Sequence, residues 1–413
     1  MKFDTIIIGG GLSGLTCGIA LSQKGQRVAI VAGGQNSLHF NAGSMELLGN
    51  VDGEEIAHPV EAAQRLQPNH PYRKVGIDHL EELAQEAKTL LDKAGLTMSG
   101  NAKENHWRIT PIGVTKPAWL TLEGLATVAS SQLPWKAVTL VELEGFIDSP
   151  LQFVETNLAA QGVQVKVARI APAALTQARR SASEMRATSL AKILRNHQAL
   201  ASLAAEINQV TTADELVLMP MFLGLDDDAL TALQAQVKPR LAFLPTLPPM
   251  VPGVRIATAL QHYFKMLGGT YLLGDKAVAG LIEDNTMRHI TTAKLQDVLL
   301  KADNFVLATG SFMSGGVVAD FTRIYEPVFG LDVEAPANRA DWTLAEVMDD
   351  QPYMSCGVAT DDTLHALKEG KAVKNLFAIG SVLSGHNAAV QGDGEGVDML
   401  TALAVAHRIT NRQ

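Results

Sequence analysis

The chain has 413 residues, of which 47% are hydrophobic and 19% charged, a composition typical of a folded globular protein. Its formal net charge of −9 argues against nucleic acid or an anionic membrane surface as a direct partner. Two cysteines, Cys17 and Cys356, are too few for an iron–sulfur cluster or a cysteine zinc site built by this chain alone, and they suit a reducing compartment.

The length exceeds what one compact core usually holds, so we expect two interleaved domains. Residues 5–23 carry no charge and faintly resemble a signal sequence, but a run of glycines interrupts them. No other stretch approaches the roughly twenty apolar residues of a membrane-spanning helix. We therefore expect a cytoplasmic protein.

The first thirty-odd residues predict a strand, a glycine turn and a helix that bind a nucleotide. The strand "FDTIII" leads into Gly9-x-Gly11-x-x-Gly14 and a helix that ends near Gly25. Gly9 permits the tight turn, Gly11 lets a phosphate approach the backbone, and Gly14 lets the helix pack closely on the strand. The helix N-terminus, which includes Ser13, offers unpaired N–H groups to an anion. Gly9, Gly11, Ser13 and Gly14 are therefore the first predicted cofactor contacts.

The second strand, "QRVAIV", ends without the acidic residue that NAD and FAD sites of this type use to hold the adenosine ribose. Ala32 stands in that place, and no Asp or Glu occurs from Thr5 to Met45. Gln35 or Asn36 could still reach a ribose. The absence favours a nucleotide without the adenosine half. FMN is such a nucleotide, with one phosphate and no second ribose, and FAD is the alternative.

The middle of the chain alternates strands and helices and predicts a second α/β domain. "KAVTLVELEG", "SPLQFVETNLAAQG" and "VQVKVARIA" are typical of strand, helix and strand, and "ELVLMP", "DDDALTALQAQVKP" and "RLAFLP" repeat that order. Residues 179–209 between them predict helix. Prolines in residues 244–252 predict a rigid crossover, followed by a helix over residues 254–267. We expect a discontinuous flavin-binding domain at 1–60, 245–320 and 355–413, and a cap or substrate domain at 61–244 and 321–354.

Two later strands also end in glycine. "ADNFVLATGSFMSGG" ends its strand at Ala308-Thr309-Gly310, and "NLFAIGSVLSG" ends its strand at Gly380-Ser381 before a last helix that follows "QGDGEG". The order of these motifs is similar to that of flavoproteins of the glutathione-reductase and fumarate-reductase type. The predicted fold class is therefore α/β, a two-domain flavoprotein with a Rossmann-like nucleotide-binding domain and an inserted α/β cap. The further predicted cofactor contacts are Gly310, Gly380, Ser381, Gln391, Gly392 and Gly394.

The last motif departs from those flavoproteins in two ways. They usually carry Asp or Glu where Ser381 stands, to bind ribityl or ribose hydroxyls. Asp393, Glu395 and Asp398 also crowd the start of the last helix, where they either cap the helix or face the flavin. No second GxGxxG unit with an acid occurs, so a dedicated NAD(P)H domain is not expected, and electrons must leave by another route.

With these residues in view, the chain resembles the B subunits of anaerobic glycerol-3-phosphate dehydrogenases over essentially its whole length. The more specific stretches are "SLHFNAGS", "LPTLPP" and "EPVFGLDV". The resemblance implies FMN in this chain, a catalytic partner that carries FAD, and an iron–sulfur partner that attaches both to the inner face of the cell membrane. It also implies oxidation of sn-glycerol 3-phosphate to dihydroxyacetone phosphate, with a quinone as the final acceptor.

Oxidation of a secondary alcohol needs a base, and a phosphorylated substrate needs cations. His39 is a candidate base or flavin contact, although a loop histidine bonded to backbone is an equal alternative. Arg255 is a candidate phosphate ligand, and a surface ion pair is its alternative. No metal-ligand spacing occurs, so no metal is predicted. Two other functions stay open: a self-sufficient FAD oxidoreductase of a small acid or alcohol, and a structural subunit with a degenerate flavin site.

Overall fold

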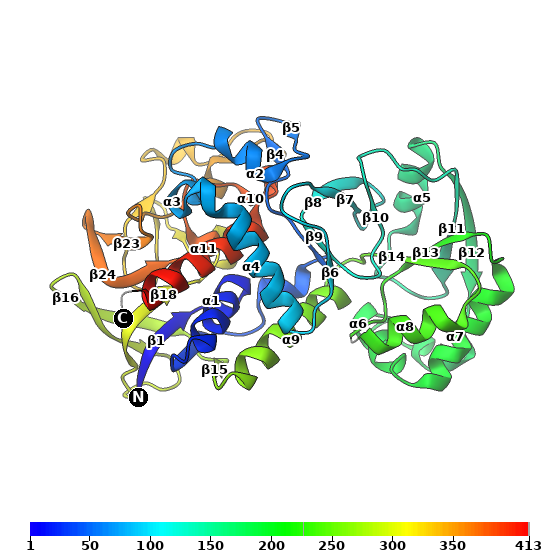
Figure 1. Ribbon diagram of the computed structural model, residues 1–413, viewed down its shortest axis with the longest axis horizontal. Coiled ribbons are helices and arrows are strands. Elements are labelled where there is room, and N and C mark those ends of the chain that lie inside the picture. Colours follow the sequence, from blue (N-terminus) through cyan, green and yellow to red (C-terminus); the bar gives the residue numbers. More distant parts are fainter. Residues whose placement is uncertain (226, 412–413) are drawn as a thin grey trace.

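The computed structural model describes residues 1–225 and 227–411 and has two lobes (Figure 1). The larger lobe contains the N-terminus and the C-terminal helix, and the smaller lobe is formed by the middle of the chain. Both lobes combine a sheet with helices, so the predicted mixed α/β class is confirmed. No helix within the described residues is long and apolar enough to cross a membrane.

The larger lobe is built on a six-stranded sheet in which β1 lies between β2 and β18. Five strands run parallel, and β23 at one edge is antiparallel to its neighbour. Strands of a parallel sheet are covered on both faces, so they form from nearly continuous apolar runs such as "VAIVA" in β2, which is buried throughout. In order across the sheet, the strands are β15 (Thr270–Leu273), β2 (Val28–Ala32), β1 (Lys2–Ile8), β18 (Lys301–Leu307), β24 (Lys371–Ala378) and β23 (His365–Lys368).

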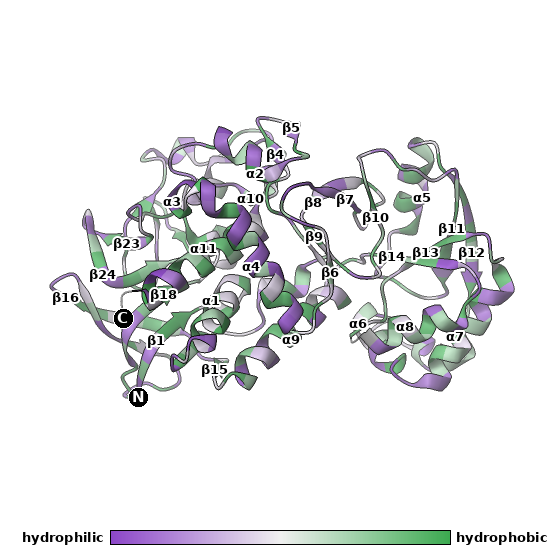
Figure 2. Cartoon of the chain, in the orientation of Figure 1, coloured by the Kyte–Doolittle hydropathy of each residue, from purple (hydrophilic) through white to green (hydrophobic). Residues whose placement is uncertain are grey.

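Two helices from opposite ends of the chain, α1 (Leu12–Gln23) and α11 (Gly394–Thr410), pack against each other. Both are buried along most of their length because α9 (Val251–Met266) also covers α1 and α4 (Leu80–Lys93) also covers α11. α4 has the one-sided pattern of a surface helix, and Figure 2 shows hydrophilic residues on its outer side beside the largely hydrophobic α11. The predicted division assigned α4 to the cap, whereas it packs on the larger lobe. The boundaries themselves stay a prediction.

The smaller lobe contains a four-stranded parallel sheet in the order β12-β11-β13-β14. The predicted alternation of strands and helices is confirmed there. The elements are β11 (Ala137–Leu143), α5 (Leu151–Ala160), β12 (Gln164–Ile170), β13 (Leu216–Pro220), α8 (Asp227–Gln236) and β14 (Arg240–Leu244).

The segment 179–209, predicted as helix, is helical for the most part but not throughout. It forms a short turn, then α6 (Ala187–Ile193) and α7 (His197–Val210). Asn196 separates the two helices, because its side-chain oxygen accepts hydrogen bonds from two backbone N–H groups at the start of α7. Asparagine favours such capping positions over helix interiors.

Small sheets lie between the two lobes (Figure 1). Trp107 of β7 and Val128 of β10 share a hydrophobic cluster with Val138 and Leu140 of β11. The strands of these sheets are β3 (Ser44–Met45), β6 (Met98–Ser99), β7 (His106–Ile109), β8 (Thr115–Ala118), β9 (Leu120–Leu122) and β10 (Thr127–Val128). The proline crossover then leads into α9, which begins at Val251 with Pro252 in its first turn and confirms the helix predicted over residues 254–267.

Candidate functional site

Three glycines in the turn after β1 are needed for three different structural reasons. Gly9 has a φ of +123°, and a Cβ there would overlap the carbonyl oxygen of Ala308. A Cβ at Gly14 would overlap the carbonyl oxygen of Gly9, so glycine permits the close packing of α1 on β1. A Cβ at Gly11 would meet nothing within 4 Å. Gly11 therefore borders open space at the N-terminus of α1, where an anion has access to backbone N–H groups.

The structure brings the first and last glycine motifs together. β1, β18 and β24 are consecutive parallel neighbours, so the glycines that follow them, Gly9, Gly310 and Gly380, lie at the same edge of the sheet. Gly380 has a φ of +70°, and a Cβ there would lie 2.6 Å from Ser13 Oγ. Ser13 of the amino-terminal turn thus sits beside the loop that follows the last strand.

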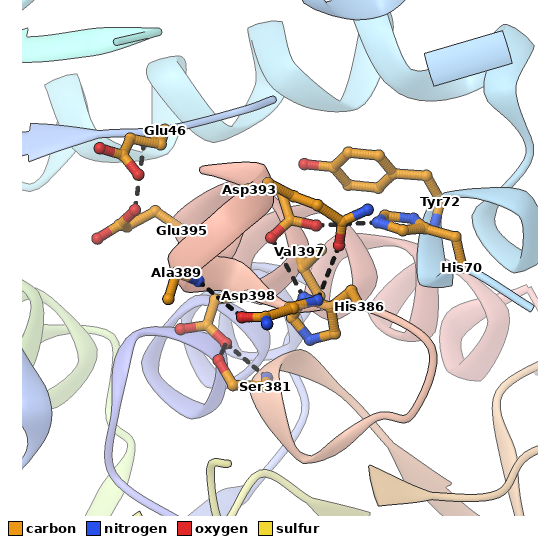
Figure 3. A network of polar contacts seen from close by, with 12 residues as sticks. Glu46, His70, Tyr72, Ser381, His386, Ala389, Asp393, Glu395, Val397 and Asp398 are labelled. Carbon is orange, nitrogen blue, oxygen red and sulfur yellow. Dashed lines mark hydrogen bonds and ion pairs between the residues drawn. The ribbon is translucent and has the colours of Figure 1, made fainter. Parts of the chain in front are cut away.

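Ser381 does not stand alone after Gly380. Its backbone N–H and its hydroxyl both donate to Asp398 Oδ1, each at 2.9 Å (Figure 3). The backbone N–H of Gly380 donates to Thr401 Oγ1 at 2.8 Å. Burial raises the pKa of Asp398 to about 6, although the two hydrogen bonds from Ser381 act in the opposite direction. The carboxylate of Asp398 is therefore hydrogen-bonded to Ser381, at the position where the sequence itself has no acid.

A buried His–Asp–His cluster lies at the start of α11 (Figure 3). Asp393 is fully buried; its Oδ2 is 2.9 Å from His70 Nε2 and its Oδ1 is 3.2 Å from His386 Nδ1. His70 Nδ1 accepts a hydrogen bond from the backbone N–H of Tyr72, so the proton of a neutral His70 lies on Nε2 and is donated to Asp393. Asp393 is the residue before the helix, but its side chain makes no cap hydrogen bond, so capping, one of the two roles left open by the sequence, does not apply to this residue.

The cluster has a defined charge pattern. Burial alone would raise the pKa of Asp393, but its interactions with His386 and His70 lower that pKa well below the usual range. Burial lowers the pKa of His70. Burial would also lower the pKa of His386, yet the nearby charge of Asp393 raises it overall. An ionised Asp393 beside a readily protonated His386 follows from this balance.

Glu395 is held differently from the other two acids. Its Oε1 accepts from Asn41 Nδ2 at 2.8 Å, and its Oε2 accepts from the backbone N–H of Glu46 at 3.2 Å. Burial, aided by the charge of Glu46, raises the pKa of Glu395 well above its usual range. Glu46 itself is paired with Arg108 at 2.7 Å.

His39 and Arg255 lie on two elements that pack together, the 3-10 turn η1 (Ser37–Phe40) and α9. His39 Nδ1 is 3.2 Å from the carbonyl oxygen of Asn36, a local backbone contact, and the His39 carbonyl accepts from Met250 N at 2.9 Å. Arg255 is only 4% exposed, which excludes the surface ion pair considered from the sequence. Their chemical roles stay predictions.

Three predicted cofactor contacts lie where the short helix α10 (Ala388–Gln391) leads into α11: Gln391 ends α10, Gly392 follows it, and Gly394 begins α11. The carbonyl of Gln391 accepts from Gly49 N at 2.8 Å, and Gly392 lies against Gly49 and Glu46. A cavity of about 180 Å³ lies here; it is lined by Glu46, Gly49, Asn50, Glu55, Lys116, Pro117, Ala389, Val390 and Gly392.

Two features of this region escaped the sequence analysis. His70 was not recognised, although His-Pro at residues 70–71 is a helix-start pattern and His70 does precede α3 (Pro71–Val75). Tyr271 of β15 was also missed. Its hydroxyl donates to the carbonyl of Gly10 at 3.2 Å, and a Cβ at Gly10 would lie 2.6 Å from Ala32 Cβ. Tyr271 thus sits at the glycine turn beside Ala32.

Comparison with known proteins identifies the family. The family model described as FAD binding domain matches residues 4–397. The B subunit of anaerobic glycerol-3-phosphate dehydrogenase from Yersinia pestis bv. Antiqua is 42% identical over 99% of this chain and 98% of its own length. The protein of the same name from Glaesserella parasuis is 37% identical over 99% of each chain.

The chain belongs to the B-subunit family of anaerobic glycerol-3-phosphate dehydrogenases. The resemblance seen in the sequence is therefore confirmed. Among solved structures, 3-ketosteroid Δ1-dehydrogenase from Sterolibacterium denitrificans matches 100% of both chains with a TM-score of 0.46 and 10% identity. The match to the FAD binding domain model also supports the predicted flavoprotein class.

The residues of this family member fit a flavin. Gly11 borders open space at the N-terminus of α1, as a phosphate requires. Thr309, next to the glycine turn, has a buried hydroxyl with no hydrogen-bond partner in the described part of the chain. Ser13 and Asp398 both lie beside Gly380. A polar ligand at this edge of the sheet would find hydroxyl and carboxylate groups already in place.

Proposed function

We propose that this chain is the flavin-carrying B subunit of an anaerobic glycerol-3-phosphate dehydrogenase. The reaction is oxidation of sn-glycerol 3-phosphate to dihydroxyacetone phosphate, with electrons passing to a quinone through partner subunits. When bound, the flavin supplies the two-electron acceptor that oxidation of a secondary alcohol requires. The observation that most supports this proposal is the meeting of Ser13 and Gly380, which unites the two glycine motifs in one site.

Within this proposal the flavin is FMN. Ala32, at the place of the ribose-binding acid, is 2% exposed and offers no side-chain acceptor. Tyr271 and Asn36 border the same turn, and both donate to the carbonyl of Gly10, at 3.2 Å and 2.7 Å. These contacts use donors, whereas a ribose needs acceptors, and the Oδ1 of Asn36 is a buried acceptor with no hydrogen-bond partner among the described residues. The case for FMN therefore rests on Ala32. The FAD alternative is favoured by the family model, whose description names FAD.

The proposed partners follow from the family. A catalytic partner that carries FAD and an iron–sulfur partner would complete the complex and attach it to the inner face of the cell membrane. The relatives are themselves named as subunits, which supports a multi-subunit assembly. His39 as base and Arg255 as a cation for the substrate phosphate remain part of the proposal, and η1 and α9 place them on adjoining elements.

The deciding experiment is denaturation of the purified chain and chromatography of the released cofactor. FMN supports the proposal. FAD instead favours a self-sufficient oxidoreductase of a small acid or alcohol. A colourless protein that takes up neither flavin on reconstitution favours a structural subunit with a degenerate site.

Gly11→Val should abolish flavin binding, because its side chain would fill the space beside the N-terminus of α1 where the phosphate approaches. We expect a flavin content below about a tenth of wild type. Fold should be kept, since a Cβ at Gly11 meets nothing within 4 Å. Gly34→Val is the matched control, because a Cβ at Gly34 also meets nothing within 4 Å. Normal flavin content in Gly11→Val would mean that the phosphate site lies elsewhere.

A further inference from the structure

Three acids crowd the start of α11, and they differ in how their oxygens are used. The two oxygens of Asp393 bond to the ring nitrogens of His70 and His386. The two oxygens of Glu395 accept hydrogen bonds from the side chain of Asn41 and the backbone N–H of Glu46. Oδ1 of Asp398 accepts hydrogen bonds from Ser381, whereas its Oδ2 accepts none from the described residues.

The free oxygen of Asp398 belongs to a side chain that is partly exposed, while Asp393 is fully buried. Figure 3 shows the Asp398 carboxylate with one oxygen toward Ser381 and the other pointing away from it. Oδ1 also lies against Gly380, the residue whose added Cβ would come within 2.6 Å of Ser13 Oγ. Asp398 therefore places its carboxylate where the amino-terminal turn and the last loop meet.

We propose that Asp398, held in place by Ser381, is a flavin-binding carboxylate that accepts hydrogen bonds from the hydroxyls of the ribityl chain. This inference rests on the proposed function, because it requires that the site binds a flavin. A carboxylate oxygen is a strong acceptor for hydroxyl donors and repels a phosphate, so the polyol part of the cofactor is the group that suits it. FMN and FAD share that part, so the inference does not depend on which flavin is bound.

The Ser381–Asp398 pair then replaces the single acid that related flavoproteins carry at the serine position. Ser381 N–H and Oγ both bind the same carboxylate oxygen, which orients the side chain and leaves Oδ2 for a ligand. The negative charge thus lies on the second turn of α11, whereas flavoproteins with an acid at the serine position carry it in the loop after β24.

Binding should depend on pH, because the ionised carboxylate accepts a stronger hydrogen bond from a hydroxyl than the protonated form does. Burial raises the pKa of Asp398 to about 6, and the ionisable groups around it are His386, Asp393, Glu395 and Tyr72. Flavin affinity should therefore increase as pH rises from about 5 to about 7. Asp398→Asn should remove the part of this dependence that belongs to Asp398.

The experiment titrates the full-length apoprotein with FMN, and in parallel with FAD, by flavin fluorescence. Asp398→Asn should raise the Kd roughly 10- to 100-fold, the size expected for loss of hydrogen bonds to a charged group. The thermal midpoint at pH 7 should not fall, because Asn keeps an acceptor for Ser381. The double variant Ser381→Asp/Asp398→Ser returns the acid to the loop, and its Kd should recover to within about threefold of wild type.

Glu142→Gln is the control, because Glu142 pairs with Arg169 on the smaller lobe, away from the glycine motifs; its Kd should stay within about twofold of wild type. If Asp398→Asn does not fold, the double variant and Ser381→Ala, which should weaken binding while keeping the acid, decide the question. A Kd for Asp398→Asn equal to that of wild type overturns the inference alone. A wild-type chain that binds neither flavin overturns the proposed function as well.

Discussion

At the scale of single residues, Asp398 and Glu395 give the fold a pH dependence. Both have a pKa that burial raises above the usual carboxyl value. A group with a raised folded pKa binds its proton more tightly in the folded than in the unfolded chain. Its contribution to stability is complete below the unfolded pKa and is lost as pH rises through the folded pKa. The raised pKa of His386 acts in the same direction at higher pH, and the lowered pKa of Asp393 acts in the opposite direction, as pH falls below about 4.

We therefore expect Asp398 alone to contribute a fall of up to about 3 kcal/mol in the free energy of unfolding of the apoprotein between about pH 4 and pH 7, while the pKa of His106, which burial lowers to about 4, contributes a rise over the same range. Asp398→Asn should remove the share of Asp398, so its curve should rise relative to that of wild type as pH increases, because asparagine does not titrate. Urea unfolding at a series of pH values measures both slopes. Parallel slopes for the variant and wild type would show that Asp398 ionises freely in the folded chain.

At the scale of secondary structure, the His–Asp–His cluster joins α11 to the start of α3. His70 begins α3 and binds Asp393, which precedes α11, across 323 residues of sequence. Next to it, a Cβ at Gly396 would overlap the hydroxyl of Tyr72, which itself donates to the carbonyl of Leu47 at 2.6 Å. The N-terminus of α11 thus packs against, and is hydrogen-bonded by, side chains at the start of α3, which explains why this helix end can be buried.

Asp393→Ala should lower the free energy of unfolding by about 3–5 kcal/mol, since it removes the hydrogen-bond partner of two buried histidines and the charge that keeps His386 protonated. Chemical denaturation at pH 6, where His386 is readily charged, measures the loss. Glu142→Ala is the control, because it removes an exposed ion pair with Arg169 and should cost no more than about 1 kcal/mol. Similar losses in the two variants would mean that the cluster contributes no more than a surface pair.

At the scale of the whole molecule, Asp148 connects the smaller lobe to the proline crossover. Asp148 is 1% exposed; its carboxylate accepts from Ala187 N at 2.7 Å and pairs with Arg186 at 2.8 Å. Its carbonyl accepts from Leu247 N at 2.6 Å, and Arg186 Nη2 donates to the carbonyl of Pro248 at 3.0 Å. These contacts hold the crossover against the lobe that it leaves.

Asp148→Ala should destabilise the chain by about 2–3 kcal/mol, because a charged and hydrogen-bonded group is removed from a buried position. The crossover should then be cut faster by thermolysin within residues 244–252, which mass spectrometry of the fragments can measure. Flavin affinity should be unchanged, because Asp148 lies in the smaller lobe. Arg169→Ala is the control for a surface charge in that lobe, and cleavage of Asp148→Ala at the wild-type rate would contradict the prediction.

The sequence by itself determined the features that depend on near neighbours along the chain. Apolar runs and turn residues specify strands such as "VAIVA", the alternation in the smaller lobe, and glycines such as Gly9 and Gly14, because their causes act within a few residues. The same local motifs carried the family resemblance. The helical composition of residues 179–209 did not predict the break between α6 and α7, because that break depends on a single capping residue, Asn196.

Only the tertiary structure decided how the motifs are joined. It placed Ser13 beside Gly380, seated Tyr271 at the turn beside Ala32, and gave three neighbouring acids three different sets of partners. Such contacts depend on which strand ends lie side by side in the sheet and on which helices cover them. The hydrogen bond from Ser381 to Asp398 spans 17 residues, and the one from His70 to Asp393 spans 323; no local pattern encodes either. A residue's ionisation and its free acceptors are set by such distant neighbours, so the chemistry of the site follows from the fold.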